Sequence, residues 1–260
     1  MLSNTIESKT LSSLSKKERK DLIVKQVNIH TRLMFTELVN LINVSEDTIR
    51  RDVNELTEDG QLIKIKGGAM SAGYNNSAGK EIYAQSGKTI IAEKALSLLK
   101  DDMIVLLGGG TTIREFIKKI PVTLKATFIT VNPVSAVELL HKPLIKTIMI
   151  GGQISGYSQM VISFEAFEYL KNIKADLCII GTNSIDVENG LTDSDWETIQ
   201  VKKAMLKAAE KIAVFAISEK LDSAMQLKIA GLDEINYLIT ELDPDNIALQ
   251  NYKVATLTIL

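Results

Sequence analysis

The sequence predicts an α/β protein in two parts: a small N-terminal domain of three helices and a hairpin, and a larger domain on a mostly parallel sheet. The length of 260 residues, with 45% apolar and 24% charged side chains, suits a globular protein of two domains. Residues 15–70 contain three amphipathic segments and one alternating segment. Beyond residue 86, strand-like apolar runs alternate with helical stretches, which is typical of a sheet covered on both faces.

Composition predicts the boundaries. Residues 1–14 are rich in Ser and Thr and are expected to be a disordered extension. Residues 15–70 form the first domain, and residues 71–86, with several Gly and Asn residues, are expected to be a linker. Residues 87–260 form the second domain.

The first domain is predicted to begin with a helix from Ser15 to about Asn28, followed by a second helix with Thr36 as its N-cap. Their buried sides are expected to be aliphatic: Leu22, Ile23 and Val27 in the first, and Leu38, Val39 and Ile42 in the second. A turn at Asn43 and Val44 leads to the third helix.

The third helix has clear start and stop signals. Ser45 suits an N-cap because its hydroxyl can accept a bond from a free backbone amide. Glu46 and Asp47 then favour the positive end of the helix, and Gly60 lies just past the predicted end. One apolar stripe at helical spacing is expected to be buried: Ile49, Val53 and Leu56.

A short hairpin is predicted next, because Gln61–Lys66 alternates and Gly67-Gly68 can form a tight turn. Three helices and a hairpin describe a winged helix-turn-helix, whose second and third helices read DNA and whose hairpin is the wing. Adjacent arginines can pair with phosphates or guanine edges, and the wing would touch phosphates. The candidate DNA-binding residues are Ser45, Thr48, Arg50, Arg51 and Asn54 on the helix, and Lys64, Lys66, Gly67 and Gly68 on the wing.

Charge supports DNA binding only through its placement. The net charge of -2 does not suggest a nucleic-acid partner, but a local basic patch suffices. Basic residues gather near the first helix, on the third helix and in the wing: Lys16, Lys17, Arg19 and Lys20, then Arg50 and Arg51, then Lys64 and Lys66. On charge alone, scattered solvated side chains explain this pattern equally well.

The second domain is predicted to contain seven strands with helices between most of them. The expected strands are Met103–Leu107, Thr127–Val131, Lys146–Ile150, Asp176–Ile180, Ile212–Ile217, Ile235–Ile239 and Val254–Ile259. The expected helices lie near 87–100, 111–119, 133–141, 163–173 and 197–211. Such Val, Ile and Leu runs between helices indicate a mostly parallel sheet.

Small and polar residues follow four successive strands, at the edge where open α/β sheets bind ligands. The run Gly108-Gly109-Gly110-Thr111-Thr112 leads into a helix, whose bare amides could cradle a phosphate. This run lacks the Gly-Lys-Ser/Thr ending of a nucleotide P-loop, and a plain tight turn also explains it. Asn132, Gly151-Gly152 and Gly181-Thr182-Asn183 follow the next strands.

Charged residues nearby could complete a ligand site. Lys202 and Lys220 could balance a phosphate, although each lysine taken singly fits a solvated surface. Asp193, Asp195 and Glu197 could bond sugar hydroxyls, and Asp195 could equally cap the helix that follows. The candidate ligand-binding residues are Gly109, Gly110, Thr111, Thr112, Asn132, Gly151, Gly152, Asp193, Lys202 and Lys220.

Other chemically notable residues suggest no cofactor and no catalysis. His30 and His141 lack partners at a spacing that suits a metal or a nucleophile, so packing or surface roles are expected. The single cysteine, Cys178, excludes an internal disulfide and is expected to be an inert buried thiol. Trp196 is expected to be a packing residue. No apolar run reaches the ~18 residues of a membrane helix and no signal-like segment is present, so the cytoplasm is the expected compartment.

Together these residues resemble a known family. The run from Val44 to Asp52, the Leu56…Gly60 ending and the Gly67-Gly68-Ala69 turn are similar to the DNA-binding domain of DeoR-type bacterial repressors. Seven further segments are similar to the family's sensor domain: Lys88…Ala92, Gly110-Thr111-Thr112, Gly151-Gly152, Asp176, Gly190-Leu191-Thr192, Lys202…Met205 and Ser218…Lys220. The resemblance implies a repressor of sugar-metabolism genes that binds double-stranded operator DNA and is released by a phosphorylated sugar or a related metabolite. It also implies a sensor fold related to ribose-5-phosphate isomerase without its catalysis.

A homodimer or homotetramer is expected, because paired reading heads match repeated operator half-sites. Gly108 and Ile217 stand where the family commonly has Asp, and Val131 precedes Asn132 where Thr is usual. The preferred sugar is therefore expected to differ from that of typical members. The same architecture could act as an activator, depending on where the operator lies. A sugar-phosphate isomerase or acyl transferase is disfavoured, because no Asp-Gly-Ala-Asp-Glu-like loop is present and strand-end carboxylates are sparse.

Overall fold

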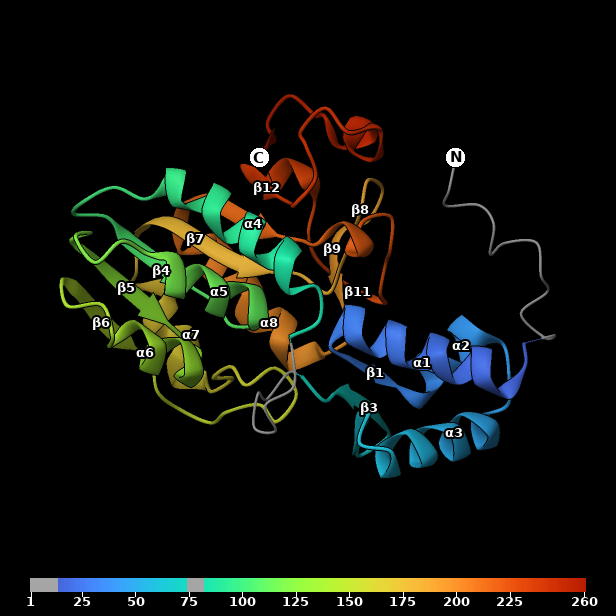
Figure 1. Cartoon of the computed structure of the whole chain (residues 1–260). Helices are drawn as coiled ribbons and strands as arrows, with labels where there is room; N and C mark the ends of the chain where they lie inside the picture. The colour runs from blue at the N-terminus through green and yellow to red at the C-terminus, as the bar shows by residue number, and fades with distance from the viewer. Residues whose placement is uncertain (1–13, 74–81) are drawn as a thin grey trace. The chain divides into compact units, whose positions relative to one another are not determined.

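The computed structural model describes residues 14–73 and 82–260. Most of the predicted extension 1–14 and the middle of the predicted linker 71–86 lie outside the described residues. The chain divides into two compact units, Met1–Tyr83 and Ala84–Leu260 (Figure 1). None of the helices within the described ranges has the length and apolar character that a membrane span requires.

The first unit is a winged helix-turn-helix, as predicted. Its elements are α1 Lys16–His30, β1 Arg32–Met34, α2 Phe35–Ile42, α3 Glu46–Glu58, β2 Leu62–Ile65 and β3 Gly68–Ser71. The three strands form an antiparallel sheet in the order β1-β3-β2. Aliphatic side chains from the three helices form a fully buried core: Ile23, Val27, Leu38, Ile42, Ile49 and Val53.

Local side-chain signals position the ends of α1 and α3. Ser15 caps α1, and Ser45 caps α3 by accepting a bond from the Thr48 amide at 3.3 Å. Gly60 follows α3 with a φ of 66°. The amides of Gly60 and Gln61 bond back to carbonyls of the last turn in a Schellman motif. The predicted start and end of the third helix are confirmed.

The predicted N-cap of the second helix is wrong. Met34 occupies the N-cap position, so Thr36 lies exposed inside the first turn. The Glu37 carboxylate accepts a bond from the Met34 amide at 2.7 Å. The cause is β1, a strand of 3 residues that runs directly into α2 and that the sequence pattern does not indicate.

Strand β1 also explains one of the two wing glycines. A Cβ atom on Gly68 would lie 2.3 Å from the carbonyl oxygen of Leu33, so only glycine allows β1 to pair beside β3. Gly67 has a φ of +78° at the turn between β2 and β3. Gly67 is exposed, whereas Gly68 is buried.

The second unit is an α/β domain on a seven-stranded parallel sheet, as predicted. Its strands are β4 Ile104–Leu107, β5 Ala126–Thr130, β6 Ile145–Met149, β7 Ala175–Gly181, β10 Ala209–Phe215, β12 Tyr237–Ile239 and β13 Thr258–Ile259. They lie in the order β13-β12-β10-β7-β4-β5-β6, and all pairings are parallel. The chain builds outward from β4 to β6 and returns to the other side of β4, so the strand order reverses between β4 and β7.

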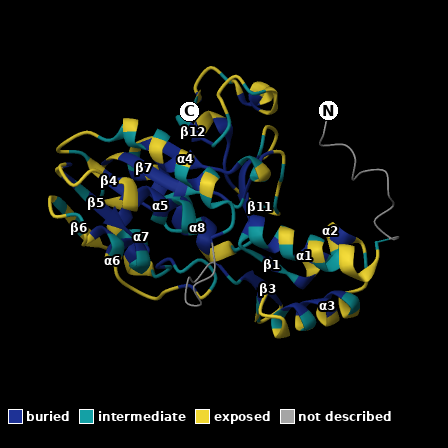
Figure 2. Ribbon diagram, viewed as in Figure 1, coloured by how far each residue is buried: buried dark blue, intermediate teal, exposed yellow. Residues whose placement is uncertain are grey.

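Helices cover both faces of this sheet (Figure 1). They are α4 Gln85–Ala95, α5 Thr111–Lys119, α6 Pro133–Leu139, α7 Phe164–Lys171 and α8 Trp196–Lys207, with short turns η2 Leu96–Leu98, η3 Ser218–Lys220, η4 Leu232–Glu234 and η5 Ile247–Tyr252. Helix α5 contacts α4 and α6, and α7 packs against α8. The central strands are buried (Figure 2). Cys178 on β7 is fully buried as expected, and burial raises the pKa of its thiol.

A second, antiparallel sheet is a feature that the sequence analysis misses. It contains β8 Ser184–Asp186, β9 Gly190–Asp193 and β11 Leu227–Ala230 in the order β11-β9-β8. Gly190 opens β9 with a φ of +72°, and a Cβ atom there would lie 2.2 Å from the Ala230 carbonyl oxygen. The tight approach of β11 therefore requires this glycine.

Candidate functional site

The two arginines on the outward face of α3 differ in their side-chain contacts. The Arg50 guanidinium lies 4.6 Å from the centre of the Phe35 ring, and its Nε donates to Glu46 at 2.8 Å. These contacts hold Arg50 along the helix. Arg51 is exposed and has no ion-pair partner within residues 14–73 and 82–260. Arg51 is therefore the arginine of the pair that is free to meet an anionic partner.

The structure joins the outward face of α3 to the wing. Lys64 Nζ on β2 donates to Asn54 Oδ1 on α3 at 2.7 Å, and both side chains are exposed. Lys66 and Gly67 are exposed at the hairpin turn. Four of the predicted DNA-binding residues thus lie on exposed parts of α3 and the wing that are in contact.

Three other predicted DNA-binding residues have structural roles of their own. The Ser45 and Thr48 hydroxyls bond one another at 2.9 Å at the start of α3. Gly68 is buried against β1. The exposed backbone at the tip of the wing is consequently that of Gly67.

Most of the basic residues near the start of α1 join helices. Arg19 Nε donates to Asp52 at 2.5 Å, and the two side chains are 15% and 2% exposed. Lys16 and Lys20 lie 2.7 and 3.3 Å from the Glu55 carboxylate. The bond to Asp52 raises the pKa of Arg19. These residues tie α1 to α3, so they do not support the basic-patch argument, and their role is to orient the reading helix.

In the second unit, the reversal of strand order brings the ends of β4 and β7 together, where ligands of open parallel sheets bind. The Gly108 amide donates to the Ile179 carbonyl at 2.9 Å. Gly110, with a φ of +110°, is the N-cap of α5 and supplies no side-chain bond. Thr111 and Thr112 therefore begin α5 with bare backbone amides, which favour an anion. We call this region, which comprises residues 108–112 after β4 and residues 181–183 at the end of β7, the switch-point crevice, a name that refers only to its place in the strand order.

Gly109 and Asn132 lie close together just past the ends of β4 and β5. A Cβ atom on Gly109 would lie 2.3 Å from Asn132 Nδ2, so no larger residue fits. Asn132 is 2% exposed. It accepts from the Ser135 amide at 2.9 Å and donates to the Gln159 carbonyl at 2.9 Å. Asn132 thus caps α6 and holds the loop that follows β6.

The loop after β6 begins with the predicted pair Gly151 and Gly152, both exposed. Gly152 has a φ of +143°, and a Cβ atom there would collide with Ser163, whereas Gly151 has open space around it. Farther along the loop, the Tyr157 hydroxyl bonds Ser194 just past β9 at 3.0 Å. The loop therefore reaches from β6 to the end of β9.

A buried ion pair lies at the end of β9. Lys202 Nζ on α8 is 2.9 Å from Asp193 Oδ2, with the two side chains 9% and 0% exposed. Asn183 and the Ser194 amide also donate to Asp193. Burial opposes the charge of Asp193, but Lys202 and these donors outweigh burial and hold the pKa of Asp193 below its usual range. Two of the predicted ligand-binding residues are thus paired with each other.

Lys220 lies at the same edge of the sheet, after β10. Its Nζ donates to the Thr182 carbonyl beyond β7 at 2.7 Å. Burial and the positive charges of Lys88 and Lys202 lower the pKa of Lys220 to about 7, against the opposing effect of Asp193. A desolvated cation beside like charges favours an anionic ligand.

Lys88 belongs to this cluster and is missing from the candidate residues. It is 6% exposed on the buried side of α4, with Ile91, Ala92 and Ala95. Burial lowers the pKa of Lys88 to about 8, although acidic neighbours raise it. A charged residue within the apolar stripe of a helix is the sequence signal that could have identified Lys88.

At the start of α8, one predicted role is confirmed and another is wrong. Asp195 accepts a bond from the Thr198 amide at 2.8 Å, so its capping role is confirmed. Trp196 is 65% exposed, so the predicted packing role is wrong. The cause is its place as the first residue of α8, where the helix has not yet entered the core. Among the described residues, no group of three or more His, Cys, Asp or Glu side chains could hold a metal ion.

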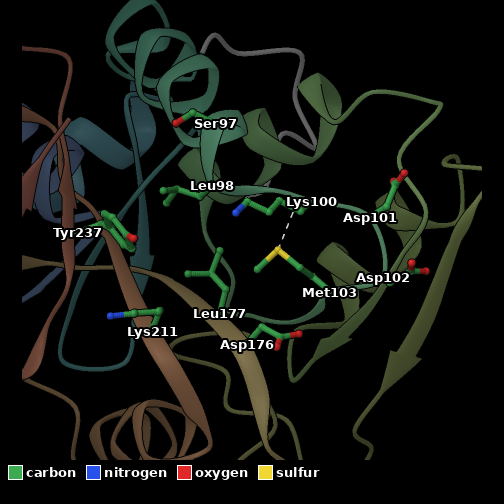
Figure 3. A pocket seen from close by; sticks show the side chains of 10 residues that line it. All are labelled: Ser97, Leu98, Lys100, Asp101, Asp102, Met103, Asp176, Leu177, Lys211 and Tyr237. Carbon is green, nitrogen blue, oxygen red and sulfur yellow. Dashed lines mark hydrogen bonds between the residues drawn. The ribbon is translucent and has the colours of Figure 1, made fainter.

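A cavity of about 500 Å³ lies at the other edge of the sheet (Figure 3). Its lining includes Lys100, Asp101, Asp176, Lys211 and Tyr237, which lie near the amino ends of β4, β7, β10 and β12. Figure 3 shows lysine and aspartate side chains spread around the opening. Because ligands of such sheets bind at the carboxyl ends, the switch-point crevice is the candidate site.

Comparison with known proteins matches both units to one family. The DeoR C terminal sensor domain matches residues 84–242, and the DeoR-like helix-turn-helix domain matches residues 19–73. The chain is 31% identical over 235 residues to the HTH-type transcriptional regulator GlpR of Haloferax volcanii, covering 88% of this chain and 92% of that protein. It is 30% identical over 237 residues to the HTH-type transcriptional repressor GlcR of Bacillus subtilis, covering 88% and 89%.

Among solved structures, ribose 5-phosphate isomerase A of Methanocaldococcus jannaschii overlaps 52% of this chain and 53% of its own, with 17% identity and a TM-score of 0.38. The sensor-domain match alone covers more than half of the chain. The protein therefore belongs to the DeoR family of helix-turn-helix transcriptional regulators.

Proposed function

We propose that this DeoR-family regulator represses carbohydrate-utilisation genes by binding operator DNA, and that a phosphorylated sugar or a related metabolite in the switch-point crevice releases it. The observation that carries the proposal is Lys220, a desolvated lysine that bonds a carbonyl at 2.7 Å, on the same sheet edge as the uncapped start of α5. The name of GlcR as a repressor supports the direction of regulation. The protein would act in the cytoplasm, where the chromosome lies.

In the DNA-bound state, α3 would enter the major groove. Arg51 would meet a phosphate or a guanine edge, and Thr48 would lie at the leading end of the helix. The Asn54–Lys64 pair, joined at 2.7 Å, would contact DNA from the seam between helix and wing. Lys66 and Gly67 would meet phosphates, which position the protein without specifying sequence. Binding should therefore weaken steeply with salt.

In the effector-bound state, the amides at Gly110, Thr111 and Thr112 would bond the phosphate oxygens. Lys220 and Lys88 would supply positive charge in a site where burial strengthens electrostatic attraction. The paired Lys202 and Asp193 would form a polar wall beside the sugar, while Gly109, Asn132, Gly151 and Gly152 would shape the crevice around it.

The proposed assembly is a homodimer or homotetramer, because repeated half-sites require paired reading heads. The segment 71–86 would transmit effector binding from the sensor domain 87–260 to the DNA-binding domain 15–70. Release requires an effector whose affinity differs between the DNA-bound and the free protein.

The experiment begins with selection of bound fragments from the host genome by the purified full-length protein. The selected fragment is then titrated with matched pairs of phosphorylated and unphosphorylated sugars. We expect at least one phosphorylated sugar to release the DNA and its unphosphorylated partner to have no effect. Failure of the whole panel to release DNA would contradict the effector half of the proposal.

A reporter gene behind the selected fragment tests the direction of regulation. Expression should rise when the regulator is deleted. A fall on deletion would show that the protein is an activator.

A further inference from the structure

Lys220 differs from the other crevice lysines in its bonding. Its Nζ donates to the Thr182 carbonyl at 2.7 Å, and no carboxylate bonds it within the described parts of the chain. The nearby carboxylate of Asp193 is occupied by Lys202, Asn183 and a backbone amide. Lys220 is therefore an amine held in place by a neutral acceptor, without a bonded counter-ion.

Its neighbours favour the neutral, nucleophilic form of this amine. Burial, Lys88 and Lys202 lower the pKa of Lys220 to about 7. About half of a lysine population with such a pKa is neutral at pH 7, on the order of a thousandfold more than for an ordinary exposed lysine. Desolvation beside another cation is an established way to activate a lysine toward carbonyl groups.

Lys220 lies on the same edge of the sheet as the proposed phosphate site. Lys220 ends η3, directly after β10, and Phe215 at the end of β10 pairs with Gly181 at the end of β7. Strand β7 in turn pairs with β4, which leads to the bare start of α5. Lys220 as a whole residue is half-buried.

We propose that Lys220 forms a reversible imine with the carbonyl carbon of an open-chain phosphorylated aldehyde or ketone, whose phosphate rests at the start of α5. This inference rests on the proposed function and names the chemical form of the effector. The neutral amine attacks the carbonyl carbon, a C–N bond forms, and the carbonyl oxygen takes a proton. The resulting carbinolamine loses its hydroxyl with a proton as water, which leaves the imine and consumes no oxidant or reductant.

The other two lysines are less suited to this reaction. Lys202 Nζ is paired with the Asp193 carboxylate at 2.9 Å. Burial lowers the pKa of Lys88 to about 8, while the charges of Glu115 and Glu219 oppose this shift and favour the protonated form. The reaction should therefore select Lys220.

The test uses two aldehydes of different size, pyridoxal 5′-phosphate and erythrose 4-phosphate, with borohydride to convert any imine into a stable secondary amine. The full-length protein is digested, and the modified lysine is identified by mass spectrometry. We expect Lys220 to carry ~10-fold or more label than any exposed lysine, because its neutral fraction is far larger. Pyridoxal without the phosphate should label Lys220 much less, and inorganic phosphate should protect it.

Matched variants separate this inference from the proposed function. Lys220→Arg keeps the charge but cannot form the imine, so phosphate should still raise its melting temperature while the label disappears. Lys228→Arg, at an exposed lysine on β11, should leave the labelling unchanged. The imine is refuted if phosphorylated sugars stabilise the protein and neither aldehyde labels Lys220 preferentially. Absence of stabilisation by any phosphorylated sugar or by phosphate would instead overturn the proposed function.

Discussion

Among the described residues, Arg19 of the first unit is paired with a carboxylate, whereas Lys220 of the second unit has no carboxylate partner. In the first unit, Arg19 of α1 meets the buried Asp52 of α3 at 2.5 Å, and Lys16 and Lys20 meet Glu55. In the second unit, Lys220 bonds only a carbonyl, because the nearby Asp193 is held by Lys202. Paired cations orient one helix against another, whereas an uncompensated buried cation stabilises little until an anion arrives. Charge pairing thus distinguishes residues that hold the fold from residues that bind a ligand.

Breaking the Arg19–Asp52 ion pair should have the greatest effect on stability. Asp52→Ala would leave Arg19 largely buried without its partner, so the free energy of unfolding should fall by about 3–5 kcal/mol. Urea denaturation of the full-length protein, followed by circular dichroism, measures the loss. Glu55→Gln removes more exposed ion pairs and should lower stability much less. Equal losses for the two variants would show that burial of the pair is not what holds α1 to α3.

The second effect tests the exposed, unpaired cation of the first unit. Arg51→Ala should weaken operator binding by about 1–3 kcal/mol, or roughly 5- to 150-fold, while leaving the melting temperature unchanged. A gel-shift titration measures the affinity. Lys17→Ala removes an exposed positive charge outside α3 and the wing, and serves as the control. If both variants bind operator equally well, α3 is not the reading helix.

Replacing a lysine or arginine by Met should change stability in opposite directions at Lys220 and at Arg19. Lys220→Met removes an uncompensated cation, so the ligand-free protein should become more stable by about 0.5–2 kcal/mol, a gain typical of relieving strain at a functional site. Effector-dependent release from DNA should be lost in the same variant. Arg19→Met in the first unit should instead lower stability, because it leaves Asp52 without its partner. Calorimetry of the two variants measures both changes. A loss of stability in Lys220→Met would contradict the view that Lys220 destabilises the ligand-free protein.

Stability is also expected to depend on pH. Lys220 and Lys88 have pKa values of about 7 and about 8, below the ordinary lysine value of 10.5. The unfolded chain therefore binds more protons between these values, so the stability of the ligand-free protein should rise from pH ~7 toward pH ~10. Melting temperatures measured across this range should rise less steeply for Lys220→Met. An identical slope for both proteins would mean that Lys220 is not the titrating group.

Local signals in the sequence were sufficient for much of the fold. Ser45 and Gly60 mark the ends of α3 because a cap and a left-handed glycine act within one helical turn. The seven parallel strands were predictable because long apolar runs between helices require burial on both faces. Glycine and threonine after β4 lie at the carboxyl edge of the sheet, as predicted from their place directly after an apolar run.

Long-range contacts account for what the sequence did not predict. Strand β1 has only 3 residues and exists because β3 pairs with it, so Thr36 lost the N-cap position to Met34. Strand β11 joins β9 from a distant part of the chain. Lys88 stands within the apolar stripe of α4, but its burial beside Lys220 follows only from the tertiary structure. Asn132 proves to hold the loop after β6. A sequence shows which groups are present, but their pairing follows from tertiary structure.

We propose that Lys220 and its neighbours at the carboxyl edge of the sheet sense a phosphorylated sugar and thereby control DNA binding. The most direct measurement is release of fluorescent operator DNA from the full-length protein during titration with phosphorylated sugars and their unphosphorylated partners, monitored by anisotropy. We expect the phosphorylated sugar to release the DNA and its unphosphorylated partner to have no effect. Lys220→Met should retain the DNA at the same concentration of phosphorylated sugar. Release by the unphosphorylated sugar, or an unchanged response of Lys220→Met, would contradict the proposal.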